Sequence, residues 1–577
     1  MVECYGEDPY LVGELGKRMV LGLQSRGLIS TPKHFAVYSV PVGGRDGQTR
    51  TDPHVAPREM RTLYLEAFRK AVCEAVVKGI MSSYNDYDGV PVTGSSYFLT
   101  DILRHEWSFR GYVVSDSEAV EFLFRKHRVA RDSVEAVAQV VNAGLNVRTA
   151  FTAPDEYVTP LREAVRRGLI SERTIDERVA DVLRAKFEMG LFDNPYKGST
   201  DNVDKVVHSA DHRAVSLRAA LESIVLLKNE GNILPLSKSL KRVAVIGPNA
   251  DETENLICRY GPANAPIKTV YKGIKERLPE TDVRYAKGCD IIDRYAPESE
   301  LYDVPLDTDE QRMLDEAVRL AGWSDAVVMV LGGNEKTVRE EFSRTSLDLC
   351  GRQQQLLSAV CATGKPVVLV MVDGRAASIN WAQRHVPGII HAWFPGEFMG
   401  DAIAQVLFGD YNPGGKLAVT FPKTVGQIPF AFPFKPGSDS PGFVRAARAL
   451  YPFGYGLSYT TFAYSDLRID KPVIGVQGSV TLTCCVRNTG SREGDEVVQL
   501  YLRDDVSSVT TYEKVLRGFE RIHLQPGEER LLAFTLTPQD LGLWNRDNRF
   551  TVEPGTFTVM VGASSEDIRL RGTFEVK

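Results

Sequence analysis

The sequence predicts a multidomain α/β protein that ends in a separate all-β domain. As far as about residue 430, short apolar runs alternate with amphipathic helical stretches, which is typical of parallel strands joined by helices. From about residue 463 the pattern changes to short alternating strands separated by turns, which indicates a β-sandwich. The 577 residues leave room for about three or four domains of roughly 100–200 residues each.

Residues 1–195 form the first α/β region. Apolar runs predict strands at 28–36, 79–84, 112–115 and 145–148, with helical stretches at 57–77 and 97–107. Repeated strand–helix units imply parallel strands, in either a barrel or an open sheet. About four or five strands are too few to close a barrel of eight. The region is therefore expected to be at most a partial (β/α) barrel.

The last helix of this region has clear signals at both ends. Thr174 and Glu177 have the spacing of a capping box at its start, and Gly190 is placed to end it. The residues that line one apolar face of this helix are Ile175, Val179, Val182, Leu183 and Phe187.

Residues 196–212 are polar and predict a linker to a second α/β region at 213–430. Strands are expected there at 242–246, 326–331, 366–371 and 388–394, with helices between them. The turn after Ile246 reads Gly247-Pro248-Asn249 and lacks the glycine spacing of a dinucleotide site. We therefore expect no nicotinamide or flavin, and no other cofactor.

Residues 431–462 are rich in Pro, Gly, Phe and Tyr, which predicts an ordered connector. Beyond it, residues 463–577 are expected to form about seven short strands, among them 479–486, 496–502, 529–537 and 555–561. Turns such as Asn488-Thr489-Gly490 separate these strands. Strands of this length and spacing predict an immunoglobulin-like or fibronectin-like sandwich.

Composition argues against several classes of function. The net charge is 69 − 75 = −6 and no basic stripe is present, so a nucleic-acid partner is not expected. No apolar run reaches about 18 residues, so no membrane-spanning helix is expected. The eight cysteines lack CxxC or other zinc-like spacing, which predicts neither a metal site nor a disulfide framework. The start, Met1-Val2-Glu3-Cys4, lacks the features of a signal peptide.

Asp116, at the end of a predicted buried strand, is the main candidate for chemistry. The residues before it, Gly111-Tyr112-Val113-Val114-Ser115, are largely β-branched or aromatic. Barrel enzymes hold their catalytic groups just past the ends of such strands. The structural alternative is that Asp116 caps a helix that starts near Glu118, because Asp is a favoured N-cap residue.

Two more strand ends carry polar side chains. Lys33 and His34 follow one strand and can donate hydrogen bonds to hydroxyl groups. Their structural alternatives are an ion pair for Lys33 and packing for His34. Met81 and Tyr84 lie at the end of the next strand. A Tyr hydroxyl beside a carboxylate can orient that carboxylate and tune its pKa.

A charged loop follows the strand predicted at 326–331. It carries Glu335, Glu340 and Glu341 ahead of Arg344. Loops of this kind are usually only solvated. A carboxylate loop at a domain boundary is also a natural source of a general acid, so the two interpretations stay open.

Over nearly its whole length the chain resembles glycoside hydrolase family three, the family of β-glucosidases and β-xylosidases. Six stretches carry the resemblance, and their order and spacing agree with the family as well. The stretches are Lys33-His34-Phe35, Met81-Ser82-Ser83-Tyr84-Asn85, Val113-Val114-Ser115-Asp116, Ser223-Ile224-Val225-Leu226-Leu227-Lys228-Asn229, Asn412-Pro413-Gly414-Gly415-Lys416-Leu417 and Tyr451-Pro452-Phe453-Gly454-Tyr455-Gly456-Leu457-Ser458-Tyr459.

The resemblance implies a partial (β/α)8-type barrel, an α/β sandwich domain and a fibronectin type III-like domain whose usual role is packing. It implies that Asp116 is the nucleophile. It also implies that Lys33 and His34 bind hydroxyls in the first sugar subsite, which Met81 and Tyr84 line.

The family's acid/base residue comes from the second domain, a few residues before an arginine. Glu340, four residues before Arg344, fits that position best. Glu341 and Glu335 remain alternatives, because this loop varies greatly within the family.

The chain departs from the family pattern in two places. Family members begin with a further segment that builds the first barrel strands, whereas this chain starts at Glu3-Cys4-Tyr5-Gly6-Glu7. This start suggests a fragment, a gene model that begins late, or a naturally shortened member. An unclosed barrel would expose a strand edge, which favours oligomerisation or aggregation. The pair Ser117-Glu118 also stands where many β-glucosidases have Trp, and it resembles the xylosidase-like and dual-specificity branches.

The expected function is that of a retaining, exo-acting β-glycosidase that releases terminal β-D-glucose or β-D-xylose from oligosaccharides or glycosides. An N-terminally truncated, inactive sugar-binding or structural remnant is the alternative. An N-acetylglucosaminidase is disfavoured, because residues 36–41 lack the His-Asp pair that the resemblance associates with that activity. The cellular location stays open, although members of the family are often exported.

Overall fold

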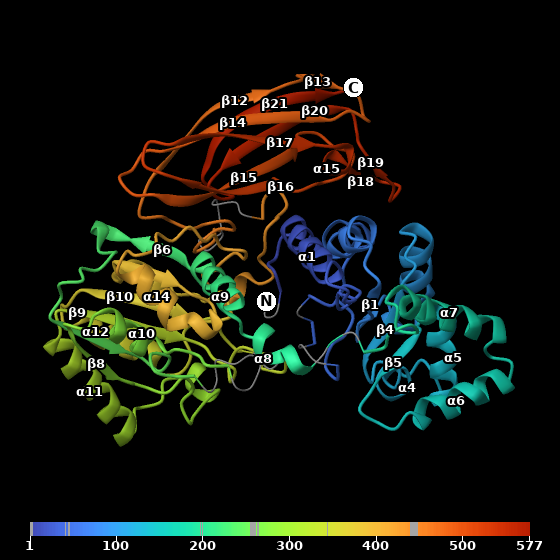
Figure 1. The fold of residues 1–577 in the computed structure, drawn as a ribbon, viewed down its shortest axis with the longest axis horizontal. Helices are drawn as coiled ribbons and strands as arrows, with labels where there is room; N and C mark the ends of the chain where they lie inside the picture. The colour runs from blue at the N-terminus through green and yellow to red at the C-terminus, as the bar shows by residue number, and fades with distance from the viewer. Residues whose placement is uncertain are drawn as a thin grey trace. The chain divides into compact units, whose positions relative to one another are not determined.

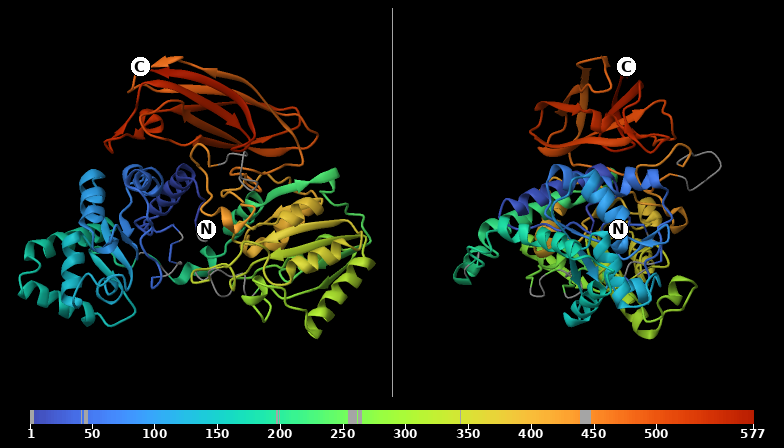
Figure 2. Two further views of the ribbon diagram at one scale, coloured as in Figure 1. Left: turned by 180° about the vertical axis from the view of Figure 1, so that it is seen from behind. Right: turned by 90° about the vertical axis from the view of Figure 1, so that its right-hand side faces the viewer.

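Figures 1 and 2 show a computed structural model of the chain. The structure describes residues 4–40, 42–43, 47–196, 198, 200–253, 261, 265–342, 344–438 and 448–577. These residues divide into two compact units. The first unit is Pro9–Val203, and the second unit is Asp204–Lys577 together with the short segment before Pro9.

The first unit is built on a parallel sheet of three short strands in the order β1-β4-β5. The strands are β1 (Gly79–Met81), β4 (Tyr112–Ser117) and β5 (Val147–Thr149). In register, Met81 pairs with Val114, and Val114 also pairs with Val147. This arc of parallel strands confirms the predicted partial barrel, with β4 between its two neighbours.

The strand predicted at 28–36 is wrong. Within this segment only Phe35 forms a β-bridge, to Ser82. The segment nevertheless lies along β1, since the N–H of Met81 donates to the Pro32 carbonyl at 3.1 Å and that of Phe35 donates to the Met81 carbonyl at 2.7 Å. Pro32 has no N–H to extend the ladder and the chain turns after Phe35, so the pairing stays too short for a regular strand.

Helical segments and short hairpin strands fill the rest of the first unit. They are α1 (Pro9–Gln24), α2 (Pro57–Glu59), η1 (Met60–Tyr64), α3 (Glu66–Arg69), η2 (Lys70–Glu74), β2 (Asp86–Tyr87), β3 (Val90–Pro91), η3 (Val92–Gly94), η4 (Tyr97–Glu106), α4 (Phe122–Arg125), α5 (Ser133–Ala143), α6 (Asp155–Arg166) and α7 (Glu172–Glu188). Strands and helices share one apolar core, which contains Phe35, Ile80, Leu99, Val113 and Val140.

Helix α7 begins earlier than the sequence predicts. Its N-cap is Ser171, whose hydroxyl accepts a hydrogen bond from the N–H of Thr174 at 3.1 Å. Thr174 therefore lies in the first turn and does not cap the helix, because its own N–H donates to the hydroxyl of the capping serine. Gly190 follows the helix with φ of 64°, which confirms the predicted stop.

The face that α7 presents to the core also differs from its prediction. Val179, Leu183 and Phe187 are 46%, 39% and 64% exposed. Asp181 is buried instead, because Arg104 lies 2.9 Å from its carboxylate. Helix α7 thus turns an ion-paired side inward and leaves an apolar strip on its surface.

The second unit contains a six-stranded sheet in the order β6-β11-β10-β9-β7-β8. The strands are β6 (Val225–Asn229), β7 (Arg242–Ile246), β8 (Asp282–Ala286), β9 (Ala326–Gly332), β10 (Val367–Val372) and β11 (Gly388–His391). Strands β7, β9, β10 and β11 confirm the predictions, because each is an unbroken apolar run. Strand β6, which runs antiparallel to β11, and edge strand β8 were not predicted.

The two edges of this sheet differ in kind. At the outer edge of β6, the N–H of Leu457 donates to the Leu226 carbonyl at 2.9 Å. Strand β8 forms the other edge and alternates between exposed and buried residues. Its exposed residues include Asp282 and Arg284, whose side chains pair at 2.7 Å.

Helices cover both faces of the six-stranded sheet. One layer holds α9 (Ala210–Ser223), α10 (Val270–Arg277) and α14 (Met399–Leu407), and the other holds α11 (Thr308–Trp323), α12 (Gln353–Cys361) and α13 (Asn380–His385). Along β7, Val243 and Val245 pack into the first layer, while Ala244 and Ile246 pack into the second. Because the inner strands β7, β9 and β10 are buried on both faces, they are almost entirely apolar, and the predicted α/β sandwich is confirmed.

Short helices occupy the predicted linker at 196–212. They are η5 (Thr200–Asn202) and α8 (Val203–Val206), and α9 already begins at Ala210. Ser209 caps α9, because its hydroxyl accepts a hydrogen bond from the N–H of His212 at 3.4 Å. The predicted connector at 431–462 is described only at 431–438 and 448–462.

The C-terminal part of the second unit is a β-sandwich. One sheet has the order β12-β14-β17 and the other β13-β21-β20-β15-β16. The elements are β12 (Phe462–Ile469), β13 (Val473–Ile474), β14 (Val480–Asn488), β15 (Gly494–Asp504), β16 (Val515–Leu524), β17 (Glu529–Leu536), α15 (Pro538–Leu541), β18 (Leu543–Trp544), β19 (Phe550–Thr551), β20 (Gly555–Gly562) and β21 (Ile568–Val576). Leu482 and Val486 from one sheet share a core with Leu500 and Val559 from the other, which confirms the predicted sandwich.

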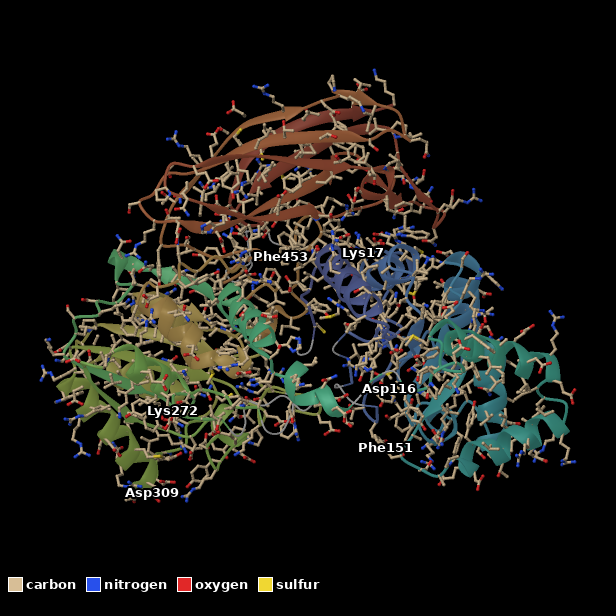
Figure 3. All side chains as sticks on the ribbon, in the orientation of Figure 1. Lys17, Asp116, Phe151, Lys272, Asp309 and Phe453 are labelled. Carbon is tan, nitrogen blue, oxygen red and sulfur yellow. The ribbon has the colours of Figure 1, made fainter. Side chains whose placement is uncertain are left out.

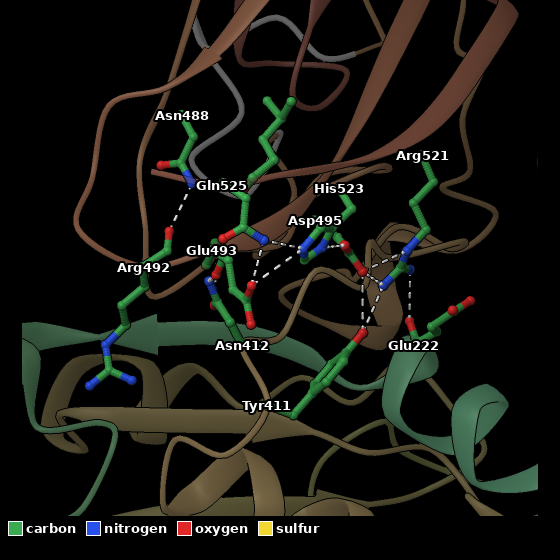
Figure 4. Close-up of polar contacts among 12 residues, drawn as sticks. Glu222, Tyr411, Asn412, Asn488, Arg492, Glu493, Asp495, Arg521, His523 and Gln525 are labelled. Atoms are coloured by element: carbon green, nitrogen blue, oxygen red, sulfur yellow. Dashed lines mark hydrogen bonds and ion pairs between the residues drawn. The ribbon is translucent and has the colours of Figure 1, made fainter. Parts of the chain in front are cut away.

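Polar contacts join the sandwich to the α/β part of the second unit (Figure 4). The guanidinium of Arg521 donates to the carboxylate of Asp495 at 2.6 Å, to the Tyr411 hydroxyl at 3.0 Å and to the Glu222 carbonyl at 3.4 Å. The imidazole of His523 lies 2.8 Å from the other Asp495 oxygen. Burial opposes ionisation of Asp495, but Arg521 and His523 outweigh it and lower its pKa.

A half-buried glutamate anchors the N-terminal segment of the second unit. One oxygen of Glu7 accepts hydrogen bonds from the N–H and hydroxyl of Thr420, at 2.9 and 2.5 Å, and from the N–H of Phe432 at 2.9 Å. Burial raises the pKa of Glu7 to about 7 against the effect of these hydrogen bonds, and neighbouring Asp8 acts in the same direction as burial.

We predict that Glu7→Gln weakens the dependence of stability on pH. Burial raises the pKa of folded Glu7 to about 7, whereas an unfolded glutamate titrates near 4.3. The folded chain thus keeps a proton that the unfolded chain releases, so the free energy of unfolding falls as pH rises from about 4.3 to about 7. Glutamine keeps the accepting oxygen but cannot ionise. Urea unfolding at about pH 5 and about pH 8 should show a smaller loss of stability in the variant than in the wild type.

Glu575→Gln is the matched control, because Glu575 lies on the surface, with a side chain 49% exposed, and pairs with Lys577 at 3.4 Å. It should retain the wild-type loss of stability. An undiminished loss in Glu7→Gln would show that Glu7 does not carry the proton.

Candidate active site

Asp116 is the fifth residue of β4 and is 8% exposed. The N–H of Ser117 donates to one carboxylate oxygen at 2.8 Å. The next helix, α4, begins at Phe122 and has Glu121 at its N-cap position. The alternative that Asp116 is a helix cap is therefore wrong, and its side chain can serve another purpose. Figure 3 labels Asp116 among the side chains of the first unit.

The imidazole of His34 lies beside Asp116. Its Nε2 atom lies 3.0 Å from the second carboxylate oxygen of Asp116. Burial raises the pKa of Asp116, but the contact and charge of His34, followed by the N–H of Ser117 and the Tyr84 hydroxyl, outweigh burial and lower it. The structure thus brings together three residues that the sequence singled out, and their effect is to keep the carboxylate ionised.

The remaining predicted residues of the first unit lie next to these three. Met81 ends β1 and pairs in register with Val114 of β4, and it is half-buried. Lys33 precedes His34 and is exposed. Tyr84 is half-buried, with its ring centroid 6.4 Å from that of His34.

Several further side chains of the first unit were missed by the sequence reasoning. Tyr38 is buried with its ring 4.5 Å from His34, and the guanidinium of Arg50 lies 4.6 Å above the Tyr38 ring. The guanidinium of Arg148, in β5, pairs with Glu121 at 2.6 Å. The position of Arg148 at a predicted strand end was a usable signal, whereas nothing in the spacing of Tyr38 and Arg50 links them to Asp116.

The charged loop of the second unit begins where β9 ends, at Gly332. Glu335 pairs with Arg339 at 3.4 Å. Glu340 is half-buried, and Glu341 is exposed with φ of 73°. Glu335 and Glu340 are thus both half-buried, whereas Glu341 is exposed, and a half-buried carboxyl group suits a proton donor better than an exposed one.

Arg375 holds this loop from the neighbouring strand end. Its guanidinium donates to the Thr337 carbonyl at 3.1 Å and to the Phe342 carbonyl at 2.6 Å. Two residues before it, Asp373 follows β10 and accepts a hydrogen bond from the N–H of Arg375 at 3.1 Å. Burial raises the pKa of Asp373 to about 6. The sequence reasoning missed both residues.

Asn249 ties the base of the loop to the sheet. Its side-chain amide donates to the Gly333 carbonyl at 2.9 Å and to the Val372 carbonyl at 3.0 Å, and it is fully buried. Asn249 follows β7 in the turn that lacks a dinucleotide motif. Here the turn serves to join three strand ends.

The described part of the chain holds no group of three or more His, Cys, Asp or Glu that could bind a metal ion. Nor does any helix among the described residues have the length and apolar character needed to cross a membrane. Cys258 lies outside the described residues, and the other seven cysteines are free thiols.

Comparison with known proteins defines the class of the chain as a glycoside hydrolase. The model of the glycosyl hydrolase family 3 N terminal domain matches residues 1–185, and that of the family 3 C-terminal domain matches residues 224–459. A fibronectin type III-like domain matches residues 496–565. The three matches follow the order of the partial barrel, the α/β sandwich and the β-sandwich described above.

Curated relatives cover the whole chain. A "Beta-xylosidase" of Formosa agariphila is 39% identical over 98% of this chain and 79% of its own length. The "Periplasmic beta-glucosidase" of Salmonella typhimurium is 37% identical over 100% of this chain and 78% of its own length.

Solved structures agree with these sequence matches. A β-glucosidase of Erythrobacter marinus has a TM-score of 0.91 at 36% identity, and covers 99% of this chain and 78% of its own. The Listeria innocua β-glucosidase in complex with isofagomine has a TM-score of 0.89 at 30% identity. The match covers 100% of this chain and 79% of that structure's chain. The chain belongs to glycoside hydrolase family 3 and is a β-glycosidase, so the resemblance found in the sequence is confirmed.

We predict that His34→Ala makes Asp116 easier to protonate. Loss of the imidazole 3.0 Å from the carboxylate leaves burial less opposed, so the pKa of Asp116 should rise. Carbodiimide reacts with protonated carboxyl groups, and peptide mass spectrometry can follow its modification of Asp116 across pH. The variant should be modified at higher pH than the wild type.

His54→Ala is the matched control, since His54 is 80% exposed and lies near Asp52. In this variant, carbodiimide modification of Asp116 should depend on pH as it does in the wild type. If the two histidine variants behave alike, His34 does not set the pKa of Asp116.

Proposed function

We propose that the protein is a retaining exo-β-glycosidase with Asp116 as nucleophile and Glu340 as acid/base. The observation that carries this proposal is the ionised, nearly buried carboxylate of Asp116 at the end of β4. A retaining enzyme needs one carboxylate that stays ionised to attack and one carboxylic acid to protonate the leaving group. The family also supplies its two carboxyl groups from two domains.

In the first step, a carboxylate oxygen of Asp116 bonds to the anomeric carbon, and the bond from that carbon to the leaving oxygen breaks. Glu340 gives its proton to the leaving oxygen. In the second step, Glu340 takes a proton from water, whose oxygen replaces the Asp116 oxygen at the anomeric carbon. The two carboxyl groups are expected about 5–5.5 Å apart during the reaction.

The surrounding residues have supporting roles in this proposal. His34 keeps Asp116 ionised between turnovers, and with Lys33 it donates hydrogen bonds to sugar hydroxyls. Met81 and Tyr84 line the sugar subsite. The domain of residues 1–195 thus binds the sugar, residues 213–430 supply the acid/base, and residues 463–577 have a packing role.

The half-buried position of Glu340 favours it over Glu341, which is exposed. Its place four residues before Arg344 favours it over Glu335, which is also half-buried and pairs with Arg339 at 3.4 Å. A side chain that leaves water on ligand binding can donate its proton more effectively than one that stays solvated.

Terminal β-D-glucose and β-D-xylose are the proposed sugars. The names of the two curated relatives, a β-xylosidase and a β-glucosidase, support both. Ser117-Glu118 after the nucleophile adds support for xylose, because that position carries Trp in many β-glucosidases. The reaction needs only water as a second substrate.

We predict that Asp116→Asn lowers kcat on nitrophenyl β-glucoside and β-xyloside by about 10⁴-fold or more, since the amide cannot form the covalent intermediate. A 2-deoxy-2-fluoro glycoside should label Asp116 in the wild type, as read by peptide mass spectrometry. Wild-type turnover by Asp116→Asn would overturn the assignment.

We predict that azide restores activity to Glu340→Ala, because an external anion can complete the second step without a base. Glu341→Ala and Glu335→Ala are the matched variants on the same loop and should keep most of the wild-type rate. Rescue of either of them in place of Glu340→Ala would move the acid/base role to that residue.

We also propose that the protein self-associates through the apolar strip on α7. Val179, Leu183 and Phe187 are 39–64% exposed there, and burying them against a second copy would remove apolar surface from water. Light scattering should find a species larger than a monomer in the wild type and a monomer in Phe187→Glu. Phe151→Glu, at a loop residue that is 90% exposed, is the control and should behave as wild type; a monomeric wild type would contradict the proposal.

A further inference from the structure

The β-sandwich carries a pocket that the glycosidase proposal does not use. It lies between the turn after β13, helix α15 and the β18–β19 hairpin. Its volume is about 270 Å³, near the lower end for small-molecule sites. The residues that line it are Val476, Gln477, Pro538, Gln539, Phe550, Thr551 and Val552. All seven are uncharged, so the lining does not match a phosphate or another ionic ligand.

Phe550 forms an exposed but fixed ring in this pocket. It is 40% exposed. A Cβ on Gly542 would come within 2.4 Å of the ring, so the absence of a side chain at Gly542 lets the ring lie directly on the backbone. The ring of Trp544 lies 5.7 Å away at 62°. The orientation of the Phe550 ring is therefore set before any ligand arrives.

Two glutamine residues line the pocket together with Phe550. Gln477 and Gln539 are both exposed, and neither side chain makes a hydrogen bond to another described residue. Their backbones are held in place, since Gln477 lies in a turn closed by a 2.7 Å hydrogen bond from Gly478 to Gly475, and Gln539 lies on capped helix α15. Each amide can donate and accept hydrogen bonds at the pocket mouth.

We propose that this pocket is an accessory binding site for a neutral β-linked oligosaccharide chain, with room for about one or two sugar residues. A sugar ring has an apolar face of C–H groups that can pack on Phe550, and its rim of hydroxyls needs partners that both donate and accept. The two amides meet that need. Such a site would hold a polysaccharide chain on the enzyme and raise the local concentration of its end.

Native gel electrophoresis of the full chain in gels that contain soluble xylan or mixed-linkage β-glucan tests this site. An exo-acting enzyme barely shortens such polymers, so the readout is independent of turnover. Both polymers should retard the wild type relative to a gel without polymer, and α-linked dextran should not. The polymer that retards more strongly identifies the preferred sugar.

Phe550→Ala should weaken binding by about tenfold, and Gln477→Ala and Gln539→Ala by about three- to tenfold each. Phe550→Tyr keeps the ring and should stay retarded. Leu531→Ala, at a residue 65% exposed on the same sandwich, is the control and should be retarded as wild type. The rate on nitrophenyl glycosides should not change in any of these variants.

Equal retardation of wild type and Phe550→Ala would overturn the proposal, as would a wild type that neither polymer retards. Full retardation of the double variant Gln477→Ala/Gln539→Ala would also overturn it, even if Phe550→Ala fails to fold. The two proposals can fail separately. If the polymers retard the protein but it hydrolyses no glycoside, only the catalytic assignment is contradicted.

Discussion

A carboxylate stays ionised inside a protein only where neighbouring groups replace the water that it has lost. This constraint separates Asp116 from two other carboxyl groups of the chain, those of Glu7 and Asp373. Glu7 and Asp373 also accept hydrogen bonds, yet burial raises their pKa values to about 7 and about 6. Asp116 differs because the imidazole of His34 lies 3.0 Å from it. Residues 32–35 pair along β1, and β1 pairs with β4. These two pairings bring His34 next to Asp116.

The parallel strands of the two sheets place polar groups in the same way. Strands β7, β9 and β10 and the first half of β4 are largely apolar, and polar side chains follow near their carboxyl ends. Asp116 follows this rule in the first unit, and Asn249 and Asp373 follow it in the second unit. The carboxyl edge of a parallel sheet gathers loops from strands that are far apart in sequence. That edge is therefore the natural place for chemistry that needs several side chains.

The sequence was sufficient for elements whose environment is uniform along their length. Strands β7, β9 and β10 are buried on both faces, so their apolar runs identify them without further information. Strand β8 has one exposed side and a weaker run, and residues 28–36 have the composition of a strand but include Pro32. The buried side of helix α7 was predicted incorrectly, because the ion pair between Arg104 and Asp181 determines which side faces the core.

Some residues of the candidate site could likewise be identified from the sequence, whereas others could not. Asp116 could be singled out because a strand that ends in a carboxylate is visible in the sequence. Its contact with His34 could not, because it depends on how two distant segments pair. The role of Met81 rested on family resemblance alone. Tyr38, Arg50 and Arg375 gave no local signal, since each acts through a packing or backbone contact that only the folded chain contains.

The two edges of the six-stranded sheet affect whether the chain aggregates while it folds. Unpaired strand edges invite other chains to add on, which leads to aggregation. The edge at β6 is occupied where Leu457 pairs with Leu226, so the connector that leads to the β-sandwich also covers it. At the other edge, an incoming strand would have to desolvate the charges of Asp282 and Arg284. The α/β sandwich can therefore fold with little risk of growing into an intermolecular sheet.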